Sequence, residues 1–173
     1  MNLKSTNSKL LCEKLQSKNN FQILEAVQEV REQGDVSVIP CMLNAYVLSS
    51  DAVVQQALAD CLCDIKNPEA ASFFIDALSN TQYALARVVI LQAIWQSGID
   101  YSKYARVFVD ILIQDDFTTA IEAFSVLDTV ADTLDSSTRK LFCERLMDAS
   151  KKIASPHKDL LLQMIEILQS DSE

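Results

Sequence analysis

The segment Val54-Gln55-Gln56-Ala57-Leu58-Ala59-Asp60-Cys61-Leu62 returns in pattern further along the chain, as Ala86-Arg87-Val88-Val89-Ile90-Leu91-Gln92-Ala93-Ile94. When the two segments are aligned, apolar residues match apolar residues at spacings of three and four, which places them on one face of a helix. The offset is about 32 residues, and a period of this size is typical of folds that stack one structural unit. The repeat is therefore the strongest indication of the fold.

The same register extends in both directions along the chain. Two apolar columns, offset from each other by four positions, recur at steps of about 32 residues. The first column contains Ala26, Leu58, Ile90 and Ala123, and the second contains Val30, Leu62, Ile94 and Leu127. A further set follows each unit, with Met42, Phe74 and Phe108 in register and Tyr46, Leu78 and Leu112 four positions later. Each unit is therefore predicted to be a pair of amphipathic helices.

The breaks between these segments carry residues that begin and end helices. Gly34-Asp35 and Gly98-Ile99-Asp100 combine a C-terminal glycine with a capping Asp, and Lys66-Asn67 offers a capping Asn. Ser49-Ser50-Asp51 and Asp115-Asp116 start further helices. Only 2 glycines and 3 prolines are present, too few for a fold rich in tight turns. We expect an all-α fold of about ten helices, with Phe21, Leu24, Val27 and Val30 forming the packed face of an early one.

One stretch resembles a known family. The residues from Val54 to Leu78, with their Asn-Pro-Glu-Ala turn and closing Ala-Leu, are similar to the short bacterial HEAT repeat, also called the phycobilisome-lyase-like HEAT repeat. Pro40 and Arg87 stand where that family often has proline and arginine. Gln55 replaces the usual arginine, and the turn from Ile99 to Tyr104 lacks the proline. The resemblance covers roughly residues 21–130.

This resemblance implies a right-handed α-α superhelix, a solenoid of stacked antiparallel helix pairs. The 173-residue length fits one domain over 1–173. Within it we assign residues 1–20 to an N-terminal cap, 21–134 to the repeats and 135–173 to a C-terminal capping pair. Terminal caps are expected because an uncapped solenoid would stack end to end.

The charge lies mainly in the centre of the chain. Between Asp35 and Asp135 there are 14 acidic residues and 4 basic ones, whereas the flanks are nearly neutral. Nucleic acid is a poor partner for such a body, because phosphate contacts need clustered Lys and Arg. No apolar run is long enough for a membrane span and no signal peptide is visible, so we expect a cytoplasmic protein that binds no membrane. We expect it to be a monomer or a weak homo-oligomer.

The 5 cysteines lie within apolar patterns, and we interpret them as small buried residues in a reducing compartment. The pair Cys61 and Cys63 is unsuited to one metal ion, because residues two apart on a helix point about 200° apart. No cofactor or metal is therefore predicted.

The expected binding surface is the concave face that second helices line in a solenoid. Its ridge residues are Gln28, Glu32, Asp60, Asp64, Gln92, Gln96, Ser125 and Thr129. They are uncharged or acidic, so the face would suit a polar or basic partner. The alternative is an ordinary solvated helix face.

Two further residues have both a binding and a structural interpretation. Trp95 is the only tryptophan and a possible anchor for a partner, but it also continues the apolar stripe of Val88 and Leu91, which favours packing between units. Arg87 could bind a ligand, although a structural partnership with an Asp of a neighbouring turn is favoured.

Catalysis finds little support in these residues. The sole histidine, His157, lies beside Pro156 in the last helix and is expected to be exposed, and no nucleophile, P-loop or zinc-protease motif occurs. We therefore expect a non-catalytic scaffold or adaptor that binds a protein or peptide. The alternatives are a bilin lyase-like or chaperone protein, suggested by the family's name, and a HEAT-like DNA glycosylase, which would bind duplex DNA.

Overall fold

The computed structural model describes residues 3–170, and over that range the chain forms ten α-helices, four 3-10 segments and no strand. The predicted all-α class and helix number are confirmed. The described residues contain no helix long and apolar enough to cross a membrane. The chain divides into two compact units, residues 1–99 and 100–173.

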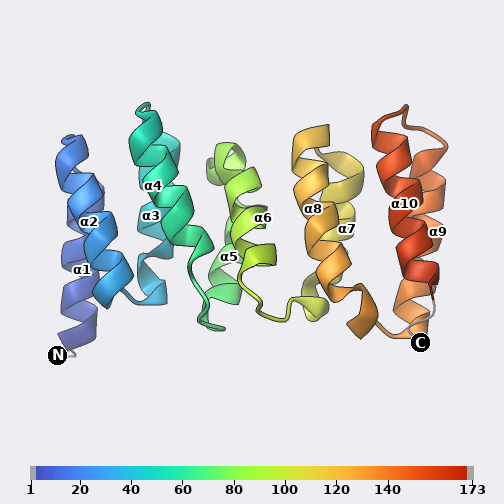
Figure 1. The fold of residues 1–173 in the computed structure, drawn as a ribbon, viewed down its shortest axis with the longest axis horizontal. Coiled ribbons are helices and arrows are strands. Elements are labelled where there is room, and N and C mark those ends of the chain that lie inside the picture. The colour runs from blue at the N-terminus through green and yellow to red at the C-terminus, as the bar shows by residue number, and fades with distance from the viewer. Residues whose placement is uncertain (1–2, 171–173) are drawn as a thin grey trace. The chain divides into compact units, whose positions relative to one another are not determined.

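The first unit consists of two layers of helices. Its helices are α1 (Leu3–Leu15), α2 (Asn20–Gln33), α3 (Ile39–Leu48), α4 (Ala52–Cys63), α5 (Ala70–Ser79) and α6 (Arg87–Gln96), with 3-10 segments η1 (Val36–Val38) and η2 (Thr81–Ala86). Helix α4 packs between α2 and α6, and α3 packs between α1 and α5 (Figure 1). The second helices of the successive pairs, α2, α4 and α6, therefore share one layer, and the first helices, α1, α3 and α5, share the other.

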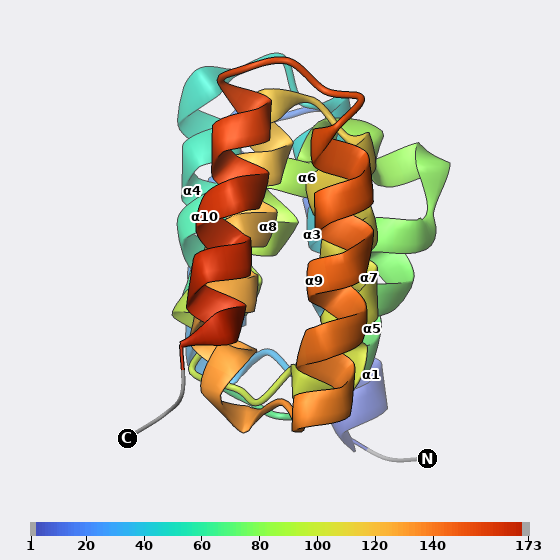
Figure 2. The same ribbon diagram turned by 90° about the vertical axis from the view of Figure 1, so that its right-hand side faces the viewer.

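The second unit repeats this arrangement with four helices. They are α7 (Ala105–Gln114), α8 (Phe117–Val130), α9 (Ser136–Ser150) and α10 (His157–Gln169), with η3 (Ser102–Tyr104) and η4 (Ala131–Thr133). Helix α8 contacts α10 and α7 contacts α9, so each layer again contains alternate helices (Figure 2).

The predicted apolar columns form the core of both units. Ala26, Leu58, Ile90 and Ala123 are each 0% exposed, on α2, α4, α6 and α8. The second column is also buried, as are Met42, Phe74 and Phe108 on the first helices of their pairs. Only Tyr46 among the aligned positions remains half-buried. Side chains one repeat apart therefore take equivalent buried positions between the two layers in successive helix pairs.

Helix starts use the polar residues that the sequence indicated. Asp51 accepts hydrogen bonds from the backbone N–H groups of Val53 and Val54, and Asp116 accepts them from Thr118 and Thr119. These bonds satisfy N–H groups that the first turn leaves unpaired. The predicted capping role of the Asp115-Asp116 turn is therefore confirmed for Asp116.

Two cysteines depart from the sequence interpretation. Cys12 of α1 and Cys41 of α3 form a disulfide, with their Cα atoms 5.4 Å apart. The expectation that all five cysteines are reduced was wrong for this pair, because α1 and α3 pack side by side and bring the two cysteines within bonding distance, which the apolar pattern around each cysteine does not reveal. The disulfide joins two helices of the same layer in the first unit.

Candidate functional site

The predicted ridge lies mainly on the layer of α2, α4 and α6. Glu32, Asp60, Asp64 and Gln96 are exposed there, as is Gln28, whereas Gln92 is half-buried. The first unit thus brings together six of the eight predicted residues. We refer to the outward side of these three helices as the second-helix face.

The remaining two ridge residues, Ser125 and Thr129, lie on α8 in the second unit. The Ser125 hydroxyl donates to the Ile121 carbonyl at 3.2 Å, and the Thr129 hydroxyl donates to the Val126 carbonyl at 2.7 Å. Both hydroxyl protons are therefore used within their own helix. These two residues can still accept hydrogen bonds from a partner.

Two carboxylates of the face are oriented by amides one helical turn away. Gln28 Nε2 donates to Glu32 Oε1 at 3.0 Å, and Gln56 Nε2 donates to Asp60 Oδ1 at 2.7 Å. Each bond uses one lone pair of an oxygen that can accept more than one donor. Both carboxylates therefore keep acceptor sites available for a partner.

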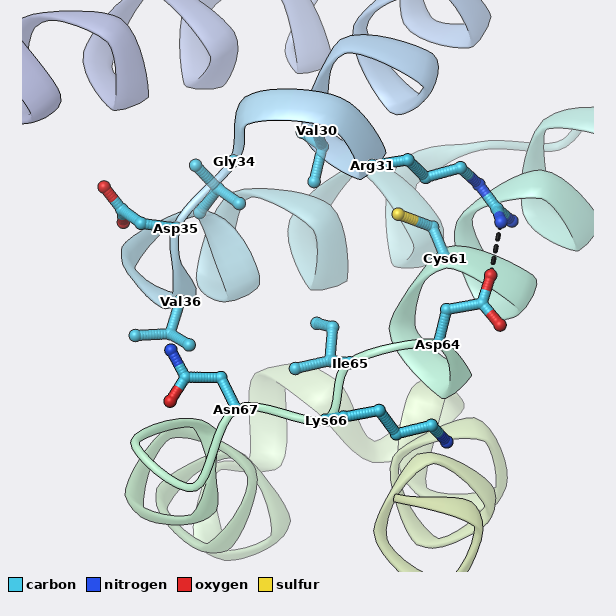
Figure 3. A pocket seen from close by; sticks show the side chains of 11 residues that line it. Val30, Arg31, Gly34, Asp35, Val36, Cys61, Asp64, Ile65, Lys66 and Asn67 are labelled. Carbon is cyan, nitrogen blue, oxygen red and sulfur yellow. Dashed lines mark hydrogen bonds and ion pairs between the residues drawn. The ribbon is translucent and has the colours of Figure 1, made fainter. Parts of the chain in front are cut away.

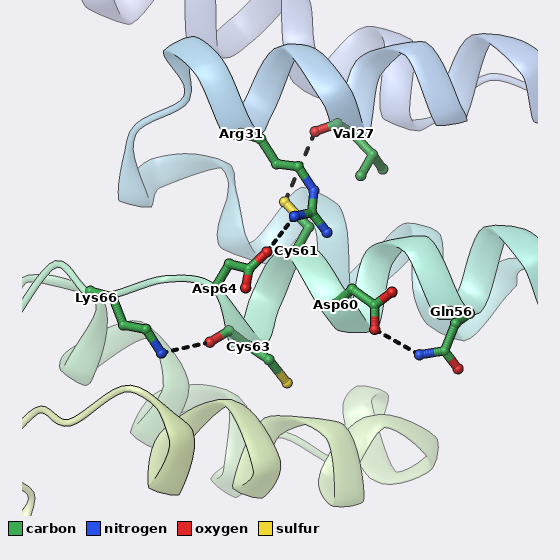
Figure 4. Close-up of polar contacts among 8 residues, drawn as sticks. All are labelled: Val27, Arg31, Gln56, Asp60, Cys61, Cys63, Asp64 and Lys66. Carbon is green, nitrogen blue, oxygen red and sulfur yellow. Dashed lines mark hydrogen bonds and ion pairs between the residues drawn. The ribbon is translucent and has the colours of Figure 1, made fainter.

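Asp64 differs from the other acids because it is neutralised from the neighbouring helix. Arg31 of α2 forms an ion pair with Asp64 at the C-terminal end of α4 (Figure 4). The ridge is therefore less acidic at this point than the sequence indicated. Arg31 and Asp64 are separated along the chain by one repeat plus one position, so the repeat register itself contains the signal for this pair.

Lys66 joins the C-terminal ends of two helices in the same layer. Its Nζ donates to the carbonyl of Cys63 at 3.1 Å and to the carbonyl of Gln96 at 2.6 Å. A cation at the end of a helix satisfies terminal carbonyls and interacts favourably with the helix dipole. Lys66 therefore serves the packing of α4 against α6.

A cavity of about 420 Å³ opens beside these contacts, between the C-terminal ends of α2 and α4 (Figure 3). Val30 and Cys61 contribute apolar surface to it, while Arg31, Asp64 and Lys66 contribute charge. Arg31 is paired with Asp64, and Lys66 is bonded to backbone carbonyls. These two cations are therefore committed to structural partners.

The thiol beside this cavity is a poor nucleophile. Cys61 is 3% exposed, and burial raises the pKa of its thiol from 9.0 to about 11, with Arg31 opposing and Asp64 adding to this shift. Its Sγ lies 4.0 Å from the Val27 carbonyl oxygen. The reactive form of a cysteine is the thiolate, so a thiol held protonated at neutral pH does not attack a substrate.

The geometry of Cys61 and Cys63 agrees with the argument from helix periodicity. Figure 4 shows the two thiols pointing away from each other, Cys61 toward α2 and Cys63 to the opposite side. In residues 3–170 no group of three or more His, Cys, Asp or Glu side chains is placed to hold a metal ion.

His157 is more buried than the sequence suggested. Its ring is half-buried, its Nε2 lies 2.6 Å from the Leu112 carbonyl oxygen, and its centroid lies 6.1 Å from that of Phe117. The expectation of an exposed ring was wrong, because the start of α10 docks against the end of α7. With Nε2 engaged by a backbone carbonyl, the side chain has a structural role within the second unit.

Sequence reasoning missed an apolar component of the second-helix face. Phe21, Val53 and Leu85 occupy the same position of successive repeats and are 66%, 67% and 78% exposed. The predicted packed face of Phe21 with Leu24, Val27 and Val30 is therefore wrong for Phe21. A spacing of three turns the helix by about 300°, so three such steps place Phe21 opposite Val30.

Trp95 and Arg87 are placed at different depths. Trp95 keeps 37% of its surface exposed, at the position equivalent to Cys63 and Arg31 in the preceding pairs. Arg87 is half-buried and donates from one guanidinium nitrogen to the Leu78 carbonyl at 3.3 Å. That contact supports a structural role for Arg87.

No protein-family model, curated protein or solved structure matches the chain. The likeness to bacterial HEAT repeats therefore stays a prediction made from the residues themselves.

Proposed function

We propose that this protein is a non-catalytic, HEAT-like scaffold or adaptor that binds a polar or basic segment of a protein on its second-helix face. The observation that carries the proposal is the side-by-side packing of α2, α4 and α6, with exposed carboxylates and amides on this layer. A set of rigid helices offers a partner fixed acceptor positions at little cost in ordering the receptor.

The chemistry of the face suits cationic donors. Glu32 and Asp60 each retain free acceptor capacity, and the chain carries a net charge of −9. A negative surface attracts a basic partner over a Debye length and speeds their encounter. Binding would then weaken as the salt concentration rises.

The finer architecture belongs to the same proposal. We infer that the helix pairs stack as in a right-handed superhelix, because the apolar columns keep their register from Ala26 to Ala123. The proposed location is the cytoplasm, where the Cys12–Cys41 disulfide would have to persist against reducing thiols, whereas an oxidising compartment favours such a bond.

Affinity capture with the full-length chain from its native cells tests this function. The informative variant is Glu32→Gln/Asp60→Asn, which removes two charges of the face and spares Asp64, whose loss would leave Arg31 without its carboxylate. Asp76→Asn, an exposed acid on α5, is the matched control. We expect a saturable partner that wild type and control retain and the face variant loses. Absence of any saturable partner would contradict the proposal.

A further inference from the structure

The second-helix face carries a row of exposed apolar side chains beside its polar ridge. Phe21 lies in the first turn of α2, Val53 in the first turn of α4, and Leu85 two positions before α6. Isolated exposed apolar residues are normal on protein surfaces. Here the same position of three successive helix pairs is apolar and at least 66% exposed, which is a pattern.

The row shares its face with the predicted ridge. Phe21 precedes Gln28 by seven positions and Glu32 by eleven, which are close to two and three full helical turns. Val53 stands in the same relation to Asp60 and Asp64. Because α4 contacts both α2 and α6, the polar rows cross the layer, and Phe21 and Val53 lie beside them on α2 and α4. Leu85 lies in η2, which contacts α6 and also packs against α3 and α5.

Charge on the face identifies the kind of partner. Glu25, Glu32 and Asp60 are exposed carboxylates on α2 and α4, while the exposed cation of these two helices, Arg31, is paired with Asp64. A segment that covers the face must therefore supply positive charge beside its apolar side chains. A second copy of this chain fits poorly, because it would bring the same carboxylates and another net charge of −9.

We propose that a basic amphipathic helix of another protein docks across α2, α4 and α6. Its apolar stripe covers Phe21, Val53 and Leu85, and its lysines and arginines reach Glu25, Glu32 and Asp60. An amphipathic helix offers both kinds of side chain along one edge, which is a common way for a peptide to occupy a surface of this type. This inference rests on the proposed binding function and specifies its partner.

A designed peptide tests the chemistry without knowledge of the natural partner. The probe is a fluorescein-labelled helix of about 18 residues, with leucines on one face and lysines elsewhere. One comparison peptide has the same composition in an order that gives no apolar face, and another has glutamate in place of lysine. Fluorescence anisotropy with the full-length protein measures each affinity. We expect the amphipathic leucine–lysine peptide to bind at least about tenfold more tightly than either comparison peptide.

Variants of the protein then separate the apolar row from the charge. Phe21→Ser/Val53→Ser/Leu85→Ser should weaken the amphipathic peptide by about tenfold or more, without a change in helix content. Glu25→Gln/Glu32→Gln/Asp60→Asn should weaken it and flatten its salt dependence. The matched control, Leu141→Ser/Met147→Ser, removes two exposed apolar side chains of α9 and should leave binding unchanged. If the triple serine variant melts lower, the three changes are measured singly.

Several results would overturn this inference. A leucine–lysine peptide that fails to bind, or that binds the triple serine variant as tightly as wild type, removes the apolar row from recognition. Capture of a cellular partner that depends on Glu32 and Asp60 would still leave the proposed function standing. Wild-type protein that sediments as a dimer, with the triple serine variant a monomer, would show that a second copy covers the face.

Discussion

Gln55 and Arg87 occupy the same position of successive repeats and bind equivalent backbone carbonyls of their own helix pairs. Gln55 Nε2 donates to the Tyr46 carbonyl and Arg87 donates to the Leu78 carbonyl, each at 3.3 Å and each to a residue nine positions earlier. Gln55 also donates to the Ser49 carbonyl at 2.9 Å. Both side chains therefore tie the start of a second helix to the end of the first, which explains why glutamine can stand where arginine does one unit later.

This shared contact predicts how substitutions at the two positions will behave. Gln55→Ala and Arg87→Ala should each lower the free energy of unfolding by about 1 kcal/mol, because a carbonyl near the helix end loses its donor. Arg87→Gln should retain most of the stability, since an amide at the equivalent position already serves. Urea denaturation measures all three. Equal losses for Arg87→Ala and Arg87→Gln would show that the guanidinium acts through another contact.

The columns predict a large effect at Leu62. This side chain of α4 is 0% exposed. Leu62→Asp should therefore destabilise the fold by several kcal/mol, because it buries a carboxylate among apolar atoms. Val53→Asp on the same helix is the matched control, because Val53 is 67% exposed and should tolerate the change. Thermal melts followed by circular dichroism measure both variants. Two similar melting temperatures would mean that the apolar columns do not form the core.

Periodicity explains why some features were predictable from sequence and others were not. The buried places of Leu58 and Ile90 follow from the repeat alone, because equivalent positions pack equivalently. The register also contains a signal for the ion pair of Arg31 with Asp64, one repeat plus one position apart, but aligning apolar columns does not show which charged side chains meet. The disulfide of Cys12 falls outside the aligned register. The prediction for Phe21 is wrong because residues spaced three apart rotate progressively around the helix, so that Phe21 lies on the side opposite Val30 and is exposed.

The disulfide predicts a defined thiol count and a stability difference. Denatured, unreduced protein should react with a thiol reagent at three cysteines, Cys61, Cys63 and Cys143, and reduced protein at five. Cys12→Ser/Cys41→Ser should lower the free energy of unfolding by about 3 to 4 kcal/mol, as expected for a loop of this length closed by a disulfide. Cys143→Ser is the control and should change stability little. Five reactive thiols before reduction would contradict the assignment.

Asp116 predicts a pH-dependent contribution to stability. Hydrogen bonds from the Thr119 hydroxyl, and then from the Thr119 and Thr118 backbone, lower the pKa of this carboxyl below its ordinary 3.8. A group with a depressed folded-state pKa stabilises the protein above its unfolded pKa, and the contribution is lost as the pH falls through the folded value. Asp116→Asn keeps a good cap that does not titrate, whereas Asp116→Ala should cost about 1 kcal/mol at neutral pH.

The measurement for Asp116 is the free energy of unfolding of wild type and Asp116→Asn between about pH 7 and pH 3. The difference between the two proteins should be constant near neutrality and move in favour of Asp116→Asn below about pH 4. Other acids titrate equally in both proteins and cancel. A difference that does not vary with pH would mean that the carboxylate makes no favourable contact in the fold.

Gly98 offers a test of the backbone at the end of α6. Its φ is +70°, in the left-handed region, and no heavy atom lies within 4 Å of the place where a Cβ would stand. Gly98→Ala should therefore cost about 1 to 2 kcal/mol from backbone strain alone, with no contribution from crowding. Gly98→Asn should cost less, because asparagine tolerates this conformation better than other residues with a side chain. Denaturation midpoints of the two variants provide the comparison. Because a Cβ at this position meets no neighbouring atom, a difference in stability between the variants reflects how well each residue tolerates the positive φ. Equal stability of wild type and Gly98→Ala would show that the chain leaves α6 by a different path.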